Sequence, residues 1–352
     1  MKSISELSLP ISEPEYRVLG GFSYSLLATF LREDDPKVLV ESTKKESGAL
    51  RFGSLVDCLM TEPEMIPERF CIRNFTSPSD QIISAMLYIY DKMPDARTFM
   101  YVPDDLKLEG AAHAEYGKTW LNTTVLKKLN DNASYYTYLQ EAEGKTLVSH
   151  TDFKTAEECV HILKTHPFTE KYMSDGDPFE EGIERINQLK FKSAYDNTLI
   201  RCMFDRIIVN HKDKTIQPID LKTTGKAEKK FEGSILDWDY YIQAGMYSQI
   251  LLDVISQDDY FKDFTILPFK FVVINRYRRK PQVWTYKLVK EDNNLIDPNE
   301  EVLLQHGFKP WRRLVIEANW HLQTGKFDYP YETYMSGGDQ EINIIRCLNV
   351  RK

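Results

Sequence analysis

Cysteine is scarce in this sequence, and no two cysteines form a Cys-x-x-Cys pair. We therefore expect no zinc ribbon or iron–sulfur clamp, but reduced thiols in a cytoplasmic protein. Apolar runs of membrane-spanning length are also missing, and the first residues, MKSISELSLPISEPEYR, are too polar for a secretory signal. The expected protein is soluble and has no membrane segment. The five cysteines are Cys58, Cys71, Cys159, Cys202 and Cys347.

An excess of basic residues is also absent. The 352 residues include 45 Lys and Arg against 53 Asp and Glu, which gives a formal net charge of -8. A surface coated in positive charge, as in nonspecific nucleic-acid binders, is therefore disfavoured. A nuclease stays compatible with this charge, because carboxylates that hold metal ions add acidic residues and a local basic track can still bind DNA.

Helical and strand-like periods both occur. Three alternating runs in 179–223, joined by the turns SAYDN and NHKDK, predict an antiparallel meander. With the helices around it, this predicts an α/β (or α+β) fold with a central mixed sheet flanked by helices. The expected parts are a flexible arm (1–19), one domain (20–330) with a helical layer (about 20–175) and a sheet with its helices (about 176–330), and a tail (331–352). Within them we expect helices in 20–31, 52–63, 234–252 and 299–324, and further strands near 267–277 and 281–289.

Two of the predicted strands carry charged residues where the alternation would bury them. In RCMFDRIIV, Asp205 is expected to share a face with Met203 and Ile207, and in PIDLKTT, Asp220 and Lys222 share a face. Two carboxylates with room for water suit Mg²⁺ or Mn²⁺, and a lysine can orient a metal-bound water. On the triplet alone, a structural ion pair of Lys222 with Asp205 or Asp220 is the favoured explanation, so a nuclease site needs further residues.

The following helix adds an amide and a phenol. Gln243 and Tyr247 are four residues apart in QAGMY and so lie on one helical face. Together they could hold a nucleic-acid strand or the scissile phosphate. Alone, the pair would be read as a packed tyrosine and a capping glutamine.

The order of these residues resembles the PD-(D/E)xK nucleases of the RecB and RecE (exonuclease VIII) type, which are related to lambda-type exonuclease. Asp205 matches the family's metal aspartate, Asp220-Leu221-Lys222 its (D/E)xK element, and Gln243-x-x-x-Tyr247 its QxxxY motif. The stretches FSYSLLATFL, FGSLVDCLMTEPE and GKTLVSHTDFKTAEECVHILKTHPF are similar to the RecE-like branch, so the resemblance covers about residues 20–255. It implies a restriction-endonuclease-like core with an N-terminal helical layer.

Two further metal ligands are expected from the resemblance. Where the family carries a histidine on an early helix, this sequence has Asp57, which can still bind Mg²⁺ or Mn²⁺ through oxygen. An Asp57 that faces solvent, with catalysis weakened or lost, is the alternative. The family's glutamate on the first strand of the meander is assigned to Glu184, within a register that the sequence leaves open by a residue or two.

Basic and hydroxyl side chains near the motifs are candidates for DNA contacts. Thr223, Thr224 and Lys226 directly follow the (D/E)xK element and are expected to contact the DNA backbone. The basic turn Arg276–Lys280 fits either a phosphate contact or a solvated hairpin turn.

The resemblance implies a metal-dependent deoxyribonuclease, namely an exonuclease on double-stranded DNA ends that uses one or two Mg²⁺ or Mn²⁺ ions. Its setting would be recombination or repair of phage or bacterial type, beside a single-strand annealing protein, and the enzyme would form a homo-oligomeric ring. Two alternatives stay open at this point. One is a noncatalytic DNA-binding or assembly protein that keeps the nuclease fold, and the other is a structure-specific endonuclease on that fold.

Overall fold

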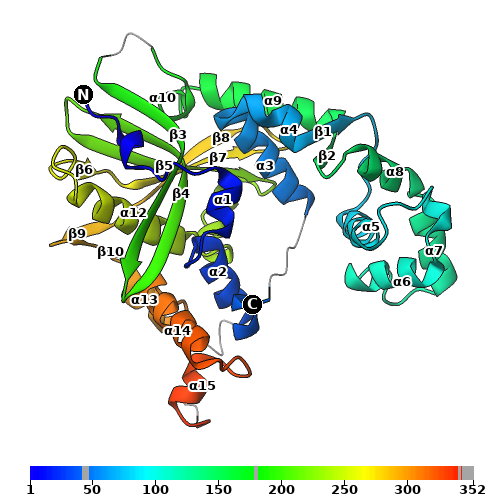
Figure 1. The fold of residues 1–352 in the computed structure, drawn as a ribbon. Helices are drawn as coiled ribbons and strands as arrows, with labels where there is room; N and C mark the ends of the chain where they lie inside the picture. The colour runs from blue at the N-terminus through cyan, green and yellow to red at the C-terminus, as the bar shows by residue number, and fades with distance from the viewer. Residues whose placement is uncertain (42–46, 178–180, 340–341, 343–352) are drawn as a thin grey trace.

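A mixed sheet forms the centre of the protein (Figure 1). The computed structural model describes residues 1–41, 47–177, 181–339 and 342. In the sheet, β3, β4 and β5 are antiparallel neighbours, β5 runs parallel to β7, and β7 is antiparallel to β8, while the short β6 pairs with β5. The expected meander and the two later strands are thus confirmed. The strands are β3 (Ile183–Tyr195), β4 (Thr198–Asn210), β5 (Thr215–Thr224), β6 (Thr265–Ile266), β7 (Phe269–Asn275) and β8 (Pro281–Tyr286).

The turn between β3 and β4 fixes their register. Asp196 and Asn197 both have positive φ, 48° and 57°, as the two-residue hairpin turns that match strand twist require. Tyr195 then pairs with Thr198, and the pairing continues to Ile183 opposite Asn210. The register places Gln188 directly across from Asp205.

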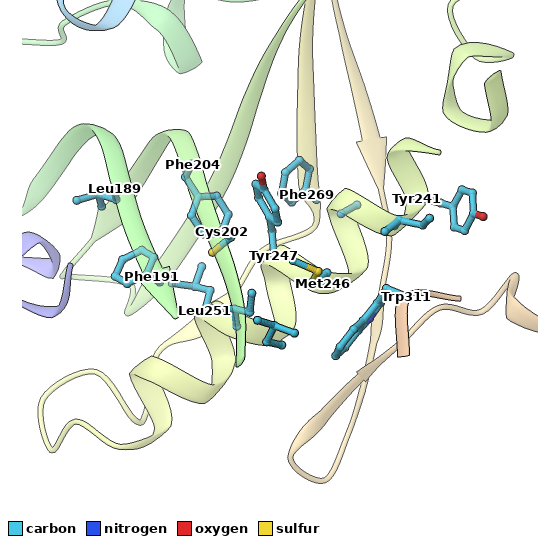
Figure 2. Close-up of a cluster of buried hydrophobic side chains, with 14 of the residues drawn as sticks. Leu189, Phe191, Cys202, Phe204, Tyr241, Met246, Tyr247, Leu251, Phe269 and Trp311 are labelled. Atoms are coloured by element: carbon cyan, nitrogen blue, oxygen red, sulfur yellow. The ribbon is translucent and has the colours of Figure 1, made fainter. Parts of the chain in front are cut away.

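One face of the sheet is covered by a helix that is buried almost all round. Helix α12 (Tyr240–Ser256) follows the short α11 (Ser234–Asp237), and Asp239, with a φ of 57°, separates the two in the segment predicted as a single helix. An apolar helix of this kind belongs inside a protein. Its side chains pack with Phe204 and Phe269 of the sheet and with helices α2 (Tyr24–Glu33) and α14 (Trp311–Thr324) (Figure 2).

Helices α3 (Gly48–Thr61) and α9 (His150–Thr165) cover the opposite face. Apolar residues of both helices pack with Ile219 and Leu221 of β5 and Val272 of β7. Helix α3 ends just before Pro63, as expected from the ring that removes a backbone donor. The sheet is therefore sandwiched between helices, with α12 on one side and α3 on the other.

Four helices form a separate group beside the sheet (Figure 1). They pack around their own apolar core, which includes Met86 and Tyr136. Two short parallel strands, β1 (Phe70–Arg73) and β2 (Thr146–Ser149), flank this group in sequence and were not predicted, because four residues are too few to show a strand period. The helices are α5 (Asp80–Lys92), α6 (Asp104–His113), α7 (Asn122–Asn130) and α8 (Ala133–Glu141).

The two ends of the chain differ from expectation. Residues 1–19, predicted as a flexible arm, contain the helix α1 (Glu13–Val18), and Ile4 is fully buried in the core. The long helix predicted for 299–324 is divided into α13 (Glu300–Gln305) and α14, because Pro310 cannot continue a helix. Part of the predicted tail, including Cys347, lies outside the described residues. No helix in the described part of the chain is long and apolar enough to cross a membrane.

Several short elements complete the description. They are η1 (Ile4–Leu7), η2 (Pro36–Leu39), η3 (Pro63–Met65), α4 (Ile66–Arg69), η4 (Phe99–Tyr101), α10 (Glu170–Met173), η5 (Glu228–Lys230), β9 (Val289–Glu291), β10 (Asn294–Ile296) and α15 (Tyr331–Met335).

Candidate active site

Strand β5 presents a buried ion pair to the α12 side of the sheet. Asp220 is only 3% exposed, and its Oδ2 lies 2.5 Å from Nζ of Lys222. Nζ of Lys222 also lies 4.7 Å from the centre of the Tyr240 ring. Burial alone would lower the pKa of Lys222, but the charge of Asp220 and the neighbouring tyrosines raise the pKa above its ordinary value. Lys222 therefore stays protonated and positively charged.

Asp205 lies where β4 and β5 separate. The backbone pairing of these strands runs from Asn210 opposite Thr215 to Arg206 opposite Ile219. Beyond that point, Oδ2 of Asp205 accepts a hydrogen bond of 2.7 Å from the backbone N–H of Leu221. The carboxylate thus takes the place of a strand carbonyl and is held beside Asp220.

The expected face of Asp205 needs a correction. Phe204 and Ile207 both pack in the core on the α12 side, although they are three positions apart and would point to opposite faces of a regular strand. The two-residue alternation of β4 is therefore interrupted at Asp205 and Arg206, so Asp205 does not follow the simple alternation with Met203 and Ile207. This interruption lies opposite Gln188, whose φ of 56° is left-handed.

Helix α12 brings Gln243 and Tyr247 to the same place. Nε2 of Gln243 donates a hydrogen bond to Oδ1 of Asp220, and the glutamine is 3% exposed. Tyr247 packs edge-on against Phe204, with ring centres 5.3 Å apart (Figure 2). Burial raises the pKa of Tyr247 well above its ordinary value, so its phenol stays protonated.

Helix α3 adds a third carboxylate from the other side of the sheet. Burial, and then the charge of Asp220, raise the pKa of Asp57 to about 7. The pKa of Asp205 is also raised, by burial first and then by the charges of Asp220 and Asp57. The charge of Asp220 therefore opposes the ionisation of both Asp57 and Asp205. We call these three residues the carboxylate cluster.

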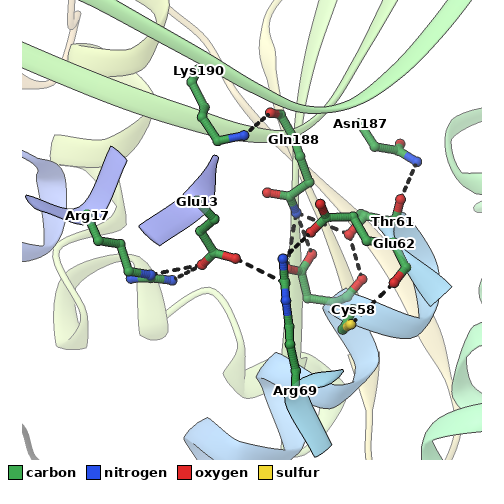
Figure 3. A network of polar contacts seen from close by, with 10 residues as sticks. Glu13, Arg17, Cys58, Thr61, Glu62, Arg69, Asn187, Gln188 and Lys190 are labelled. Atoms are coloured by element: carbon green, nitrogen blue, oxygen red, sulfur yellow. Dashed lines mark hydrogen bonds and ion pairs between the residues drawn. The ribbon is translucent and has the colours of Figure 1, made fainter. Parts of the chain in front are cut away.

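Gln188 of β3 belongs to this site, and sequence reasoning missed it. Its Nε2 donates to Oδ2 of Asp57 at 3.2 Å and to Oγ1 of Thr61 at 3.1 Å (Figure 3). The signal was available: counting back in pairs from the turn at Asp196 and Asn197 places residue 188 across from Asp205. The side chain facing the carboxylate cluster from the first strand of the meander is thus a glutamine.

A second polar network surrounds Gln188 and Asp57. Arg69 lies 3.0 Å from Glu13 of α1 and 2.9 Å from Glu62 at the end of α3 (Figure 3). The charges of Glu13 and Glu62 also contribute to the raised pKa of Asp57. The ordered N-terminal segment is therefore part of the electrostatic surroundings of the carboxylate cluster.

Glu184 lies elsewhere. It pairs with Val209, four residues along β4 from Asp205, which corresponds to about 13 Å. Its carboxylate accepts hydrogen bonds from Oγ of Ser3 and from the backbone N–H of Ile4 at 3.2 Å, and Nε2 of His211 is 3.4 Å away. Glu184 therefore anchors the first residues of the chain, and the structure does not bring it to the carboxylate cluster.

The three proposed DNA contacts lie at the end of β5, beyond the carboxylate cluster. Oγ1 of Thr223 would be 3.2 Å from a Cβ atom added to Gly53, so this threonine faces α3 at close range. Oγ1 of Thr224 accepts from the backbone N–H of Lys226 at 3.0 Å. The ammonium of Lys226 pairs with Asp237 and donates to Ser234 at 3.1 Å, so its charge is already engaged.

The residue types of the site fit a divalent cation such as Mg²⁺. The carboxylate cluster offers oxygen ligands whose mutual repulsion a cation would relieve. In the described part of the chain, Oε1 of Gln243 is buried without a hydrogen-bond partner, and no three acidic, histidine or cysteine side chains already converge as a finished metal site. Lys222 instead neutralises Asp220. Cation binding would therefore require these side chains to move closer together.

Comparisons with known proteins give matches of very different strength. No curated protein matches the sequence. Among solved structures, the crystal structure of a putative exonuclease from Eubacterium rectale has 11% sequence identity, and the match covers 78% of this chain and 94% of that one. Its TM-score of 0.29 is too low to carry an argument about function.

A family match covers the site itself. Residues 35–276, more than half of the chain, match the PDDEXK-like domain of unknown function (DUF3799). The matched range includes the carboxylate cluster, Lys222 and Gln243, and the central mixed sheet flanked by helices agrees with such a domain. The chain therefore belongs to this PDDEXK-like family and has its nuclease-type fold.

Proposed function

We propose that the protein is a metal-dependent deoxyribonuclease that hydrolyses phosphodiester bonds, acting as an exonuclease on double-stranded DNA ends. The observation that carries this proposal is the carboxylate cluster beside Lys222. Burial, and then the charge of Asp220, raise the pKa of Asp57 and of Asp205 beside a charged lysine, so ionisation of these two carboxyl groups costs stability. Such an arrangement is typical of a site built for chemistry rather than for folding.

The proposed roles follow from the contacts of each side chain. Asp57, Asp205 and Asp220 would hold one or two Mg²⁺ or Mn²⁺ ions. A bound cation would lower the pKa of the water molecule that it binds and would neutralise negative charge on the phosphate. Nζ of Lys222, held between Asp220 and the Tyr240 ring, is placed to orient the attacking water and to stabilise negative charge. Gln243 fixes Asp220 by its hydrogen bond.

The biological setting rests on the order of the sequence motifs alone. The resemblance to RecE-like nucleases supports a role in recombination or repair of phage or bacterial type, beside a single-strand annealing protein. A homo-oligomeric ring would gather positive charge in a central channel in spite of the net charge of -8. Size measurement in solution, with and without DNA, tests the ring.

The reaction can be tested on linear and closed circular duplex DNA, each with Mg²⁺, with Mn²⁺ and with a chelator. We expect mononucleotides from linear DNA only, in the presence of either metal and not with the chelator. Cutting of circles would instead assign the structure-specific endonuclease. DNA binding without degradation of either substrate under any metal would assign the noncatalytic DNA-binding protein.

The lysine provides a second test. Replacement of Lys222 by alanine removes the only cation paired with Asp220 among the described residues and should lower the cleavage rate by about 10²- to 10⁴-fold. The matched control is Lys262→Ala, because Lys262 is exposed and pairs with Asp259 far from the carboxylate cluster. Equal rates for the two variants in a single-turnover assay would refute the role of Lys222.

A further inference from the structure

We propose that a cavity beside the carboxylate cluster binds a phosphate group of the DNA strand being cut. This inference rests on the proposed function, because it assigns the substrate's backbone to a second subsite. The cavity measures about 390 Å³ and lies between α3, the group of helices containing α5, and the end of β5. The lining residues that matter here are Gly48, Arg51, Ser79, Asp152, Thr224 and Arg276.

Three helices begin at this cavity. Helices α3, α5 and α9 have the N-caps Ser47, Ser79 and Ser149, and residues of the first turn of each helix line the cavity. Each helix end carries backbone N–H groups and a partial positive charge, and together these form an anion site. All three helices are at least 13 residues long, so their dipoles are fully developed.

Two arginines add full positive charges. The side chain of Arg51 is 15% exposed, and its buried Nη1 has no hydrogen-bond partner among the described residues. The guanidinium of Arg276 lies 4.3 Å from the centre of the Phe52 ring, and both side chains line the cavity. A planar guanidinium is suited to phosphate oxygens.

Each arginine also faces one carboxylate. Arg276 pairs with Asp152, while Arg51 is 3.5 Å from Asp80, which is longer than a strong hydrogen bond. Each arginine thus has one carboxylate neighbour, and the three helix N-termini add partial positive charge at the cavity. Asp80 lies at the rim, with its side chain 59% exposed, and accepts the N–H of Gly48 at 2.8 Å. It occupies the position that a phosphate oxygen would take.

The cavity lies at a suitable distance from the carboxylate cluster. Arg51 and Asp57 are six residues apart on α3, or about 9 Å along the helix axis. Gly53, between them, packs against Thr223 at the end of β5. Since nucleotides of one strand advance about 3.4 Å each along a duplex, the bound phosphate would lie two or three nucleotides from the bond being cut.

The first test measures binding of a short fluorescein-labelled DNA duplex by anisotropy in a chelator, where no cleavage occurs. Arg51→Ala and Arg276→Ala should each weaken binding about 5- to 20-fold and lower the salt dependence by about one phosphate contact. The matched control is Arg279→Ala, because Arg279 lies on the same turn as Arg276 and pairs with Glu158 of α9, but does not line the cavity. Equal loss in all three variants would overturn the proposal.

A second variant is expected to bind DNA more tightly, a result that misfolding cannot produce. Asp80→Asn keeps an oxygen for the N–H of Gly48 but removes the charge that competes with phosphate. Affinity for the same duplex should rise about 3- to 10-fold. The control is Asp105→Asn, an exposed carboxylate in the first turn of α6. An unchanged or weaker affinity for Asp80→Asn would also overturn the proposal.

These measurements separate the subsite from the proposed activity. If the arginine losses and the Asp80→Asn gain occur but no DNA is degraded under any metal, the phosphate subsite stands and the nuclease proposal fails. If DNA is degraded while none of these variants alters binding, the nuclease proposal stands and the subsite is refuted.

Discussion

Asp220→Asn should lower the rate of DNA cleavage by about 10³-fold or more. Asp220 is the carboxylate that touches both Lys222 and Gln243, and its replacement removes the charge at the centre of the site. Asparagine retains an oxygen for the hydrogen bond from Gln243, so the local packing should persist. The measurement is a single-turnover cleavage assay on linear duplex DNA, combined with thermal unfolding to confirm folding.

The matched control for this variant is Glu184→Gln. It makes the same change from acid to amide on β3 of the same sheet, and glutamine still accepts the hydrogen bond from Ile4. We expect a cleavage rate within about twofold of the original protein, because Glu184 lies outside the carboxylate cluster. If Glu184→Gln lost as much activity as Asp220→Asn, Glu184 would take part in catalysis. If Asp220→Asn kept the original rate, Asp220 would not.

Asp57→Asn should stabilise the metal-free protein while weakening its response to Mg²⁺. Burial, and then repulsion by the charge of Asp220, raise the pKa of Asp57 to about 7, so ionisation of this group destabilises the folded state. The amide removes this repulsion and can still bond to Gln188. At about pH 8 we expect a gain on the order of 1 kcal/mol, or about 2–4 °C in Tm.

The sign of the pH dependence follows from the same shift. The pKa of Asp57 is about 7 in the folded protein against an ordinary value of 3.8. Between these values the folded state holds a proton that the unfolded state has lost, so this group lowers the free energy of unfolding as pH rises toward 7. Asp57→Asn should flatten the decline in Tm between about pH 5 and pH 8.

Two controls make this result decisive. The exposed Asp105→Asn should leave both Tm and its pH dependence unchanged. Addition of Mg²⁺ at about pH 8 should raise the Tm of the original protein more than that of Asp57→Asn, because a cation relieves repulsion only where it exists. If Asp57→Asn destabilises the metal-free protein, Asp57 is a structural residue held by Gln188 rather than part of a strained cluster.

The half of the site on β5 and α12 was accessible from the sequence. Asp220 and Lys222 share a face because a strand has a period of two, and Gln243 and Tyr247 share one because a helix places every fourth residue together. Neither relation depends on tertiary packing. The contact between Gln243 and Asp220 joins the helix to the strand and was not predicted by these short-range rules.

The other half depended mainly on tertiary packing, although counting residue pairs back from the turn at Asp196 and Asn197 would have placed Gln188 across from Asp205. The interruption of β4 at Asp205 comes with a left-handed residue, Gln188, which has neither the glycine nor the turn context that would announce it. Gln188 rather than Glu184 therefore faces the carboxylate cluster. The partners of Asp57 come from β3 and β5, more than 100 residues away, and only packing of α3 on the sheet reveals them.

The contacts within the site close chain loops of very different length. Gln243 and Asp220 are 23 residues apart, whereas Gln188 and Asp57 are 131 residues apart. Short loops cost less entropy to close, and local contacts form earlier in folding. The β5–α12 unit should therefore assemble first, and α3 should dock on it late. Native-state hydrogen exchange should then show α3 opening before the sheet, so that Asp57 leaves the site while Asp220 and Lys222 remain paired.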